Sequence, residues 1–211
     1  MKFGDFAKIK GLQTTAGFRD NLTKLGLAMP CDDIVASGPA SPLGASLTVG
    51  NLAIGNRFAI QPMEGWDCLE DGRPSENTIR RWRNFGLSGA KLIWGGEAVA
   101  VRHDGRANPN QLTMTEASKP EIAKMRETLV AAHREAMGND DGLVIGLQLT
   151  HSGRFCKPND KARMEPMILY RHPILDRKFK LGPDYPVMSD GDIRKLIGDY
   201  VIAAKHAQDC G

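Results

Sequence analysis

The stretch GLVIGLQLTHSGR at residues 142–154 decides the fold class of this chain. Its first half is an apolar run, and its second half carries the polar side chains of Gln148, His151 and Arg154. Apolar runs of this length are typical of strands that are buried on both faces of a parallel sheet. In α/β folds, ligands bind at the carboxyl ends of such strands. The stretch therefore predicts a buried parallel strand that delivers polar groups to a binding site.

The composition is that of an ordinary globular protein. The chain has 211 residues, of which 41% are hydrophobic and 25% are charged. This length suits one domain or most of an α/β barrel of about 250 residues. No stretch reaches the roughly 18 consecutive apolar residues that a membrane span needs. Charged residues also interrupt the first ten positions, where a secretory signal requires an apolar core. We therefore expect a cytoplasmic protein without a membrane partner.

Charge and cysteine content indicate neither a nucleic-acid partner nor a metal site. The net charge is +3, and the one basic cluster, residues 80–83, lies on a predicted helix, where a solvated face is the simpler interpretation. The four cysteines are far apart and form no Cys-x-x-Cys pair. The spacing of zinc or iron–sulfur ligands is therefore absent. We expect free thiols.

A shift in composition near residue 46 divides the chain. Residues 1–46 contain one helical pattern, around residues 18–27, and then a stretch rich in proline, glycine and serine. We interpret residues 1–46 as an irregular leader and linker, and residues 47–211 as the folded part. Two short apolar runs on either side of Gly50 open the folded part and predict a β-hairpin.

Strand and helix patterns alternate after the hairpin. Strands are predicted at residues 57–62, 90–94 and 143–149. Helix starts are predicted at Ser75, at the capping box of Ser118 and Glu121, and at Ser189. Helix ends are predicted near Gly86 to Gly89, at Gly138 and at Gly211. A repeated strand–helix order implies a parallel sheet covered by helices. The sequence therefore predicts an α/β protein, a partial (β/α)8 TIM barrel of about three strand–helix units.

The long segment at residues 155–188 does not follow this alternation. It is rich in proline and charge and has no clear periodicity. Loops of this length are usually functional or disordered, so an active-site lid and a disordered segment are both open interpretations. Three strands also leave an unpaired sheet edge unless more chain or a partner covers it. We therefore expect the N-terminal part of a barrel, truncated before its fourth strand.

Each predicted strand ends in residues that suit a flat ligand. Met63 and Trp66 offer apolar surface after the first strand, and two glycines after the second let a ligand approach the backbone. Gln148 offers one acceptor and two donors, which suits the imide-like edge of a flavin or a nucleobase. Each motif is weak alone, because buried side chains and close helix packing explain it equally well. The strand ends of a parallel barrel nevertheless meet at one face.

Four motifs together resemble the Old Yellow Enzyme family. They are NRFAIQPM at 56–63, DGRP at 71–74, GEAVAV at 96–101 followed by DGR at 104–106, and LQLTHSGR at 147–154. The set is specific, and the resemblance covers residues 47–211. It implies an FMN-binding barrel that takes hydride from NADH or NADPH and passes it to an activated alkene or a related electrophile. The partner so implied is a small-molecule substrate, and the complete protein is compatible with a homo-oligomer.

The resemblance assigns roles to residues after the first strand. Pro62 and Met63 resemble the backbone and apolar wall beside the isoalloxazine ring. Glu64 stands where family members often carry threonine or cysteine near the flavin, which is a departure from the family pattern. Trp66 falls where an aromatic residue often borders the substrate.

The other implied cofactor contacts follow the second and third strands. Ala98 resembles the small residue that packs on the flavin, and Gln148 resembles the amide that hydrogen-bonds its pyrimidine edge. The family's proton donor, substrate-binding His pair and phosphate loops are expected beyond Gly211, so no catalytic residue is assigned. A flavin without its phosphate contacts lacks strong charge-assisted hydrogen bonds. We therefore expect this chain alone to bind FMN weakly or not at all.

Two other functions stay open at this level. One is a non-catalytic half-barrel that serves as a binding or assembly module. The other is a barrel enzyme that uses phosphate-bearing substrates without a flavin. A reading frame that continues past residue 211 into an apolar strand ending in histidine would favour the flavin enzyme, whereas a natural stop codon would favour the module.

Overall fold

Two units make up the chain in the computed structural model, which describes residues 2, 4 and 6–211. They are Met1–Ala45 and Ser46–Gly211. The helix of the first unit is α1, Thr15–Lys24, which starts where the Thr14 hydroxyl accepts a hydrogen bond from the Gly17 amide. This helix lies three residues closer to the N-terminus than the apolar pattern predicts, because the cap fixes its start.

The second unit begins with the predicted hairpin, which is confirmed. Strand β1, Leu47–Val49, pairs in antiparallel fashion with β2, Leu52–Ile54, and Gly50 adopts a positive φ of 58° in the turn. Glycine adopts such a backbone without steric cost.

Parallel strands follow the hairpin. Three of them form one sheet in the order β3-β4-β6, and two more form the pair β5-β7. Their bounds are Ala59–Ile60 for β3, Leu92–Ile93 for β4, Ala98–Ala100 for β5, Val144–Ile145 for β6 and Gln148–Thr150 for β7. The parallel order agrees with the predicted barrel-type α/β fold, and β6 and β7 each lie at the end of their ladder.

Two of the strand predictions need correction. The run at residues 143–149 is not one strand, because it divides into β6 and β7 at Gly146 and Leu147. The residues after β4, interpreted as a glycine loop, contain the further strand β5. The cause is Gly95, whose φ of +65° lies outside the strand region. This residue interrupts the strand between β4 and β5.

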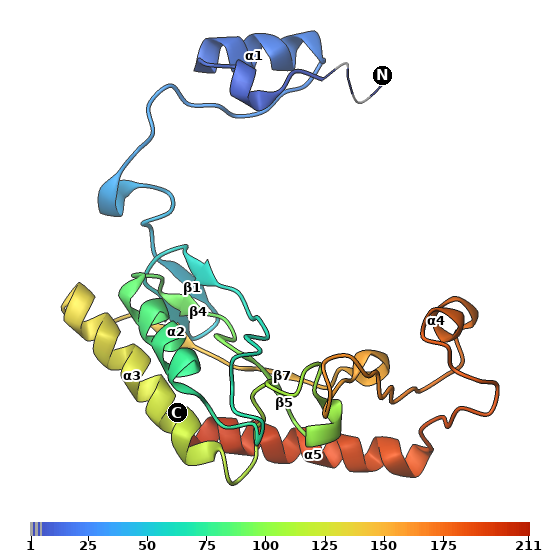
Figure 1. The fold of residues 1–211 in the computed structure, drawn as a ribbon. Coiled ribbons are helices and arrows are strands. Elements are labelled where there is room, and N and C mark those ends of the chain that lie inside the picture. The colour runs from blue at the N-terminus through green and yellow to red at the C-terminus, as the bar shows by residue number, and fades with distance from the viewer. Residues whose placement is uncertain (1, 3, 5) are drawn as a thin grey trace. The chain divides into compact units, whose positions relative to one another are not determined.

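Four helices accompany the strands of the second unit (Figure 1). They are α2 at Glu76–Leu87, α3 at Lys119–Met137, α4 at Pro173–Lys178 and α5 at Asp190–Asp209. The predicted starts of α2 and α5 are confirmed, since Ser75 and Ser189 each form a capping box with the residue three positions later.

The helix-end predictions for α3 and α5 are correct in part. Gly138 ends α3 with a φ of +82°, as expected. The capping box of Ser118 and Glu121 is wrong, because the Ser118 hydroxyl donates to the Thr113 carbonyl (2.5 Å) and makes no cap hydrogen bond. Helix α5 is capped by Cys210 rather than by Gly211.

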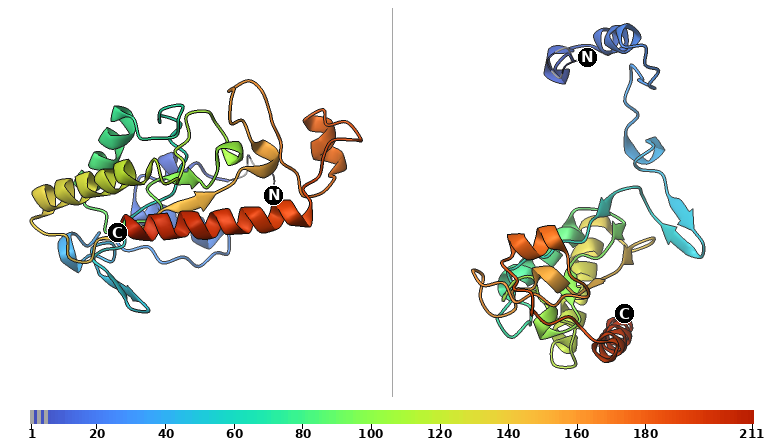
Figure 2. Two further views of the ribbon diagram at one scale, coloured as in Figure 1. Left: turned by 90° about the horizontal axis from the view of Figure 1, so that it is seen from below. Right: turned by 90° about the vertical axis from the view of Figure 1, so that its right-hand side faces the viewer.

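The core of the second unit lies between the strands and helices α2, α3 and α5. Its fully buried members include Trp82, Ile93, Val99, Leu112, Met125, Leu129 and Ala203. Helices α2 and α3 lie side by side, and α5 runs along β7 (Figures 1 and 2). A Cβ at Gly86 would lie 2.3 Å from the Leu129 carbonyl oxygen, so this glycine permits the close approach of α2 and α3. None of the helices among the described residues has the length and hydropathy to span a bilayer.

The segment at residues 155–188 carries more structure than its sequence indicates. It contains α4, and Ile168 and Val187 form a parallel bridge. The Asp176 carboxylate, which is 7% exposed as a residue, pairs with Arg154 and with Arg171. Polar contacts within the segment therefore replace the apolar periodicity that sequence analysis looks for.

Candidate functional site

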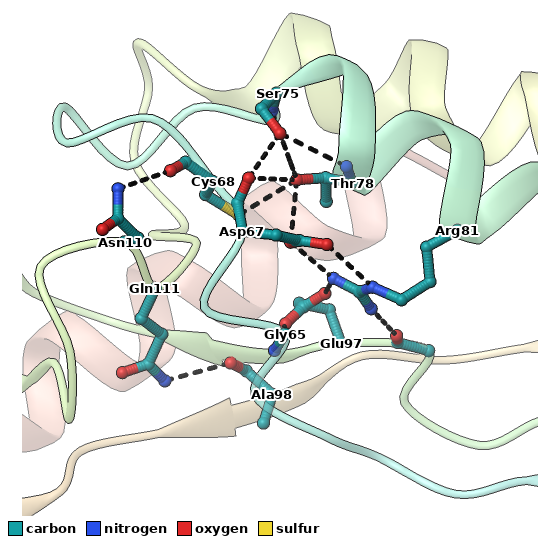
Figure 3. Close-up of polar contacts among 11 residues, drawn as sticks. Gly65, Asp67, Cys68, Ser75, Thr78, Arg81, Glu97, Ala98, Asn110 and Gln111 are labelled. Carbon is teal, nitrogen blue, oxygen red and sulfur yellow. Dashed lines mark hydrogen bonds and ion pairs between the residues drawn. The ribbon is translucent and has the colours of Figure 1, made fainter.

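A buried carboxylate fixes the loop that follows β3. Glu97 is 0% exposed, and its Oε1 accepts a hydrogen bond from the Gly65 amide at 2.8 Å. Its Oε2 pairs with Nη2 of Arg81 on α2 at 2.6 Å. The loop after β3, helix α2 and the start of β5 are thus joined through one side chain (Figure 3).

Arg81 also holds the next turn of the same loop. Its Nε and Nη2 donate to the two carboxylate oxygens of Asp67 at 3.1 and 2.9 Å, and the Thr78 hydroxyl donates to the same carboxylate at 3.0 Å. A Cβ at Gly65 would lie 1.9 Å from Arg81 Nη2, so a larger residue there would displace the guanidinium from its carboxylate partners. Two-point binding of a guanidinium to a carboxylate sets orientation as well as distance.

The charges in this network perturb one another. Burial raises the pKa of Glu97, and the Gly65 amide and the Arg81 charge offset only part of that effect. Burial acts in the same direction on Asp67 and is the largest single influence, but the hydrogen bonds from Arg81 and Thr78 and the charge of Arg81 together outweigh it and lower the pKa of Asp67. Burial would lower the pKa of Arg81, yet its two carboxylate partners raise it. Arg81 therefore stays positively charged and holds the loop in place.

A buried amide ties the ends of β5 and β7 together. Gln111 is 0% exposed, and its Nε2 donates to the Ala98 carbonyl at 3.0 Å and to the Thr150 hydroxyl at 3.2 Å. Its Oε1 accepts a hydrogen bond from the Ala107 amide at 2.7 Å. The next residue back, Asn110, donates to the Cys68 carbonyl at 2.8 Å. The strand ends are therefore fixed by side chains from the loop after β5.

Two cavities lie near these strand ends. The first, which we call the inner cavity, has a volume of about 290 Å³ and is lined by Trp94, Gly95, Gly146, Leu147 and Gln148. A Cβ at Gly95 would lie 2.9 Å from Pro62 Cβ and 3.0 Å from the Gln148 amide nitrogen. Pro62, Gly95 and Gln148 are thus brought together, and the Gln148 side chain is exposed.

The second cavity, which we call the outer cavity, has a volume of about 520 Å³. Residues from four segments line it, among them Glu64, Trp66, Ala107, Phe155, Lys157, Lys178 and Phe179. Trp66 adopts a φ of +50°, which is unusual for a residue with a bulky side chain. Its indole Nε1 donates to Glu64 Oε2 at 3.0 Å.

The site residues expected from sequence occupy different surroundings. Gln148 lines the inner cavity, and Pro62 lies against Gly95, which lines the same cavity. Glu64 and Trp66 line the outer cavity. Met63 is 68% exposed, and its carbonyl accepts a hydrogen bond from the Ala98 amide at 3.1 Å.

Three further residues have surroundings that favour structural roles. Ala98 is 4% exposed, and its side chain lines neither cavity. His151 accepts a hydrogen bond from the Gly153 amide at 3.1 Å and lies against Gly105, where an added Cβ would approach its ring to 2.5 Å. Arg154 pairs with Asp176 and donates to the Tyr170 carbonyl at 2.5 Å.

Sequence reasoning missed the residues that hold the site. Arg81 was interpreted as part of a solvated basic face, and this is wrong, because its side chain is 24% exposed and contacts two carboxylates. The available signal was its position three residues after Thr78, which places both side chains on one face of α2. Nothing in the sequence marks Gln111, because the two groups to which its amide donates lie 13 and 39 residues away.

The fold defines a class, a partial (β/α)8 barrel with cavities near its strand ends. Residues 42–211 match the model of the NADH:flavin oxidoreductase / NADH oxidase family, and the chain belongs to this family. Its members are FMN-dependent oxidoreductases, which implies FMN as the cofactor and NAD(P)H as the reductant.

Several solved structures share the fold of this chain. An Old Yellow Enzyme homologue from Zymomonas mobilis is 22% identical with a TM-score of 0.56, and the match covers 80% of this chain and 46% of that one. Morphinone reductase in complex with tetrahydroNAD is 19% identical with a TM-score of 0.58, and covers 80% of this chain and 47% of its own. A complex of 2-naphthoyl-CoA reductase with 2-naphthoyl-CoA is 16% identical with a TM-score of 0.61, and the match covers 81% of this chain and 26% of that one. The chain thus spans at most about half of these proteins. No curated protein sequence matches it.

Proposed function

We propose that this chain supplies the flavin-ring part of an FMN-dependent oxidoreductase of the ene-reductase type. The complete enzyme passes hydride from NAD(P)H to an activated alkene or a related electrophile. The observation that carries the proposal is the inner cavity, which is lined by the exposed residue Gln148. The backbone of Gln148 lies beside Gly95, at a point where a Cβ would clash with it. We also propose a cytoplasmic location, on the composition of the chain.

The residues of the inner cavity fit the ring of a flavin. An exposed side-chain amide can both donate to and accept from the pyrimidine edge, as Gln148 would here. Gly95 leaves the backbone accessible, and Pro62 and Met63 add apolar surface at the same strand ends. When bound, the flavin supplies the redox chemistry, and the protein supplies orientation and electrostatics.

The same residues do not provide a phosphate site. The five residues that line the inner cavity include no cation. A phosphate monoester is held best by charge-assisted hydrogen bonds from arginine, lysine or a helix N-terminus. We therefore assign the ring contacts, and not the phosphate contacts, to this part of the protein.

Two departures from the expected contacts refine the proposal. Glu64 accepts a hydrogen bond from the Trp66 indole, so it acts here by positioning that ring. Ala98 is buried and contributes through its backbone, which links Met63 to Gln111. Glu97 and Arg81 hold the loop that carries Trp66, so we regard both as positioning residues.

Two of the similar structures support the reductant and the kind of substrate. Morphinone reductase is seen with tetrahydroNAD, and 2-naphthoyl-CoA reductase with 2-naphthoyl-CoA. A nicotinamide dinucleotide and a planar conjugated acyl compound are therefore the ligand classes to test first.

The test uses protein expressed from the complete natural reading frame and purified with FMN. Anaerobic NADPH or NADH should bleach the visible absorbance of the flavin, and 2-cyclohexenone should restore it. Gln148→Ala should raise the FMN dissociation constant by about tenfold, because up to two hydrogen bonds of roughly 1 kcal/mol each are lost. Gln208→Ala, at an exposed position of α5, is the matched control and should change nothing. Unchanged FMN affinity and turnover in Gln148→Ala would contradict the assignment.

A second candidate function is a non-catalytic half-barrel that assembles with a partner. The observation in its favour is that β6 and β7 each end a ladder, so their outer edges are unpaired within the described residues. Open edges are sites for strand pairing. The same experiment separates the two functions, since a module would show neither flavin reduction nor reoxidation.

A further inference from the structure

We propose that the outer cavity binds a planar, apolar ligand that carries an anionic group. The aromatic residues Trp66, Phe155 and Phe179 would contact the plane, and Lys157 and Lys178 would hold the charge. The inference rests on the proposed function, for which it names a ligand class, but it concerns a cavity that the flavin-ring residues do not line.

The size and lining of the cavity suit a small molecule. Its volume of about 520 Å³ lies within the range of roughly 300–1,000 Å³ that is usual for small-molecule sites. Trp66 and Phe155 are 51% and 53% exposed, which is a large aromatic surface for a concave region. The rings of Phe155 and Phe179 pack edge to face, with centroids 5.4 Å apart at 89°. This contact restrains both rings and gives the cavity a preformed apolar wall.

The backbone of Trp66 is held in a costly conformation. A φ of +50° costs on the order of 1–3 kcal/mol for such a residue and persists only where the surroundings enforce it. Here the preceding Gly65 amide is fixed by Glu97, and the indole is fixed by Glu64. Glu97, 32 residues from Gly65, and Glu64, two residues from Trp66, thus keep this ring at the border of the cavity. Strain of this kind is a pointer to a binding role.

The charges at the cavity favour an anion. Neither Lys157 nor Lys178 has a carboxylate partner within 4.0 Å among the described residues. Lys157 Nζ donates only to the Lys161 carbonyl at 3.3 Å, and Lys178 Nζ lies 5.7 Å from the centre of the Phe179 ring. Glu64 is the one acidic residue in the lining, and its carboxylate accepts from Trp66. The lining therefore has an excess of positive charge next to aromatic surface.

Two kinds of molecule that a flavin oxidoreductase binds combine a planar ring with an anionic group. One is a substrate acid with a conjugated or aromatic body, and the other is the phosphate-bearing reductant with its nicotinamide ring. Both place an anionic group near a planar ring. The test therefore includes a probe for each source.

The experiment measures binding to the 211-residue chain by calorimetry at low ionic strength, without FMN. The probes are 2-naphthoate, its neutral analogue 2-naphthamide, and NADH. We expect 2-naphthoate to bind at least fivefold more tightly than 2-naphthamide. The double variant Lys157→Gln/Lys178→Gln should weaken 2-naphthoate binding by about tenfold, since exposed charge pairs contribute up to about 1 kcal/mol each, and should leave 2-naphthamide unchanged.

Two control variants show which residues contribute to binding of the probes. Lys161→Gln removes a nearby exposed charge that does not line the cavity, and it should retain the preference for the anion. Trp66→Ala should weaken both naphthyl probes, because it removes apolar surface rather than charge. If NADH displaces 2-naphthoate and also depends on the two lysines, the reductant is a source of the anion and the proposal stands.

Three outcomes would overturn the proposal. They are the absence of binding by all three probes, equal affinity for acid and amide, and an unchanged affinity for 2-naphthoate in the double lysine variant. Because FMN is absent, these outcomes are independent of the flavin test. Failure here with intact flavin reduction in the complete protein would refute only the ligand class.

Discussion

At the scale of single residues, the buried pair of Glu97 and Arg81 is the feature on which the site depends. The pair joins side chains 16 residues apart across 2.6 Å, with Glu97 0% exposed. A buried ion pair adds little stability relative to apolar residues, but removal of one partner is costly because it leaves a buried charge alone. The pair therefore acts chiefly to specify where the loop with Gly65 and Trp66 lies.

Arg81→Met tests this role. We expect the free energy of unfolding to fall by about 3 kcal/mol, since Glu97 would remain buried without its cation. The measurement is urea denaturation at neutral pH. Arg83→Met on the same helix is the matched control, because Arg83 is 49% exposed and lies 3.7 Å from Glu135, and it should cost less than about 1 kcal/mol. Equal effects of the two substitutions would show that the buried pair has no special role.

Asp67 makes the stability depend on pH. Burial raises its pKa, but the hydrogen bonds from Arg81 and Thr78 and the charge of Arg81 together lower the pKa below the ordinary value of 3.8. A lowered folded-state pKa stabilises the protein above the ordinary value, and this contribution is lost as pH falls through the lower folded value. We expect Asp67→Asn to flatten the fall of unfolding free energy at acid pH, in denaturant titrations from pH 6 downward.

The pKa shift of Glu97 has the opposite direction to that of Asp67. Burial raises the pKa of Glu97, so Glu97 contributes with the opposite sign and cannot mimic the Asp67 effect. Asp141→Asn, at an exposed position, serves as the control. An unchanged pH slope in Asp67→Asn would contradict the assignment of the acid transition to this carboxylate.

At the scale of elements, the starts of α2 and α5 and the end of α3 were predictable, whereas the strand limits were not. Ser75 and Ser189 form caps with residues three positions away, so a short window of sequence contains both partners. The division between β4 and β5 depends on Gly95, which meets Pro62 and Gln148 from other strands. Two adjacent glycines in the local sequence indicate a flexible backbone. They do not indicate at which residue the strand pairing is interrupted.

Helix α5 offers a pair of opposite glycine substitutions. A Cβ at Gly198, in the middle of α5, would meet nothing within 4 Å, so Gly198→Ala should stabilise the chain by roughly 0.5–1 kcal/mol. Gly138, which ends α3, has a φ of +82°, so Gly138→Ala should destabilise by roughly 1 kcal/mol although its Cβ also meets nothing. Thermal melts of both variants provide the measurement. The same sign for both would mean that backbone conformation does not decide these effects.

At the scale of the whole molecule, the chain spans 46% and 47% of two solved relatives. The inner cavity, which we propose as the flavin-ring site, has no cation in its lining. The division into residues 1–46 as a leader and linker and 47–211 as a barrel part stays a prediction about function.

The whole-molecule prediction concerns the cofactor. We expect the 211-residue chain to bind FMN weakly or not at all, and to show little difference between FMN and riboflavin, because the lining of the inner cavity includes no cation to contact the phosphate. Equilibrium dialysis with both compounds measures this. Near-stoichiometric flavin in the purified chain, or a strong preference for FMN, would show that a phosphate site exists in these residues.

The sequence by itself determined the family, the parallel α/β fold, the hairpin and two helix caps, because apolar runs, caps and contiguous motifs are local features. It also singled out Gln148, Pro62 and Trp66, since each stands at a strand end. Only the tertiary structure decided that Glu97 and Arg81 hold the loop, that Ala98 is buried and that two lysines border an aromatic cavity. These arrangements depend on contacts between residues far apart in the chain, whose distances and burial are set by packing and not by neighbouring residues.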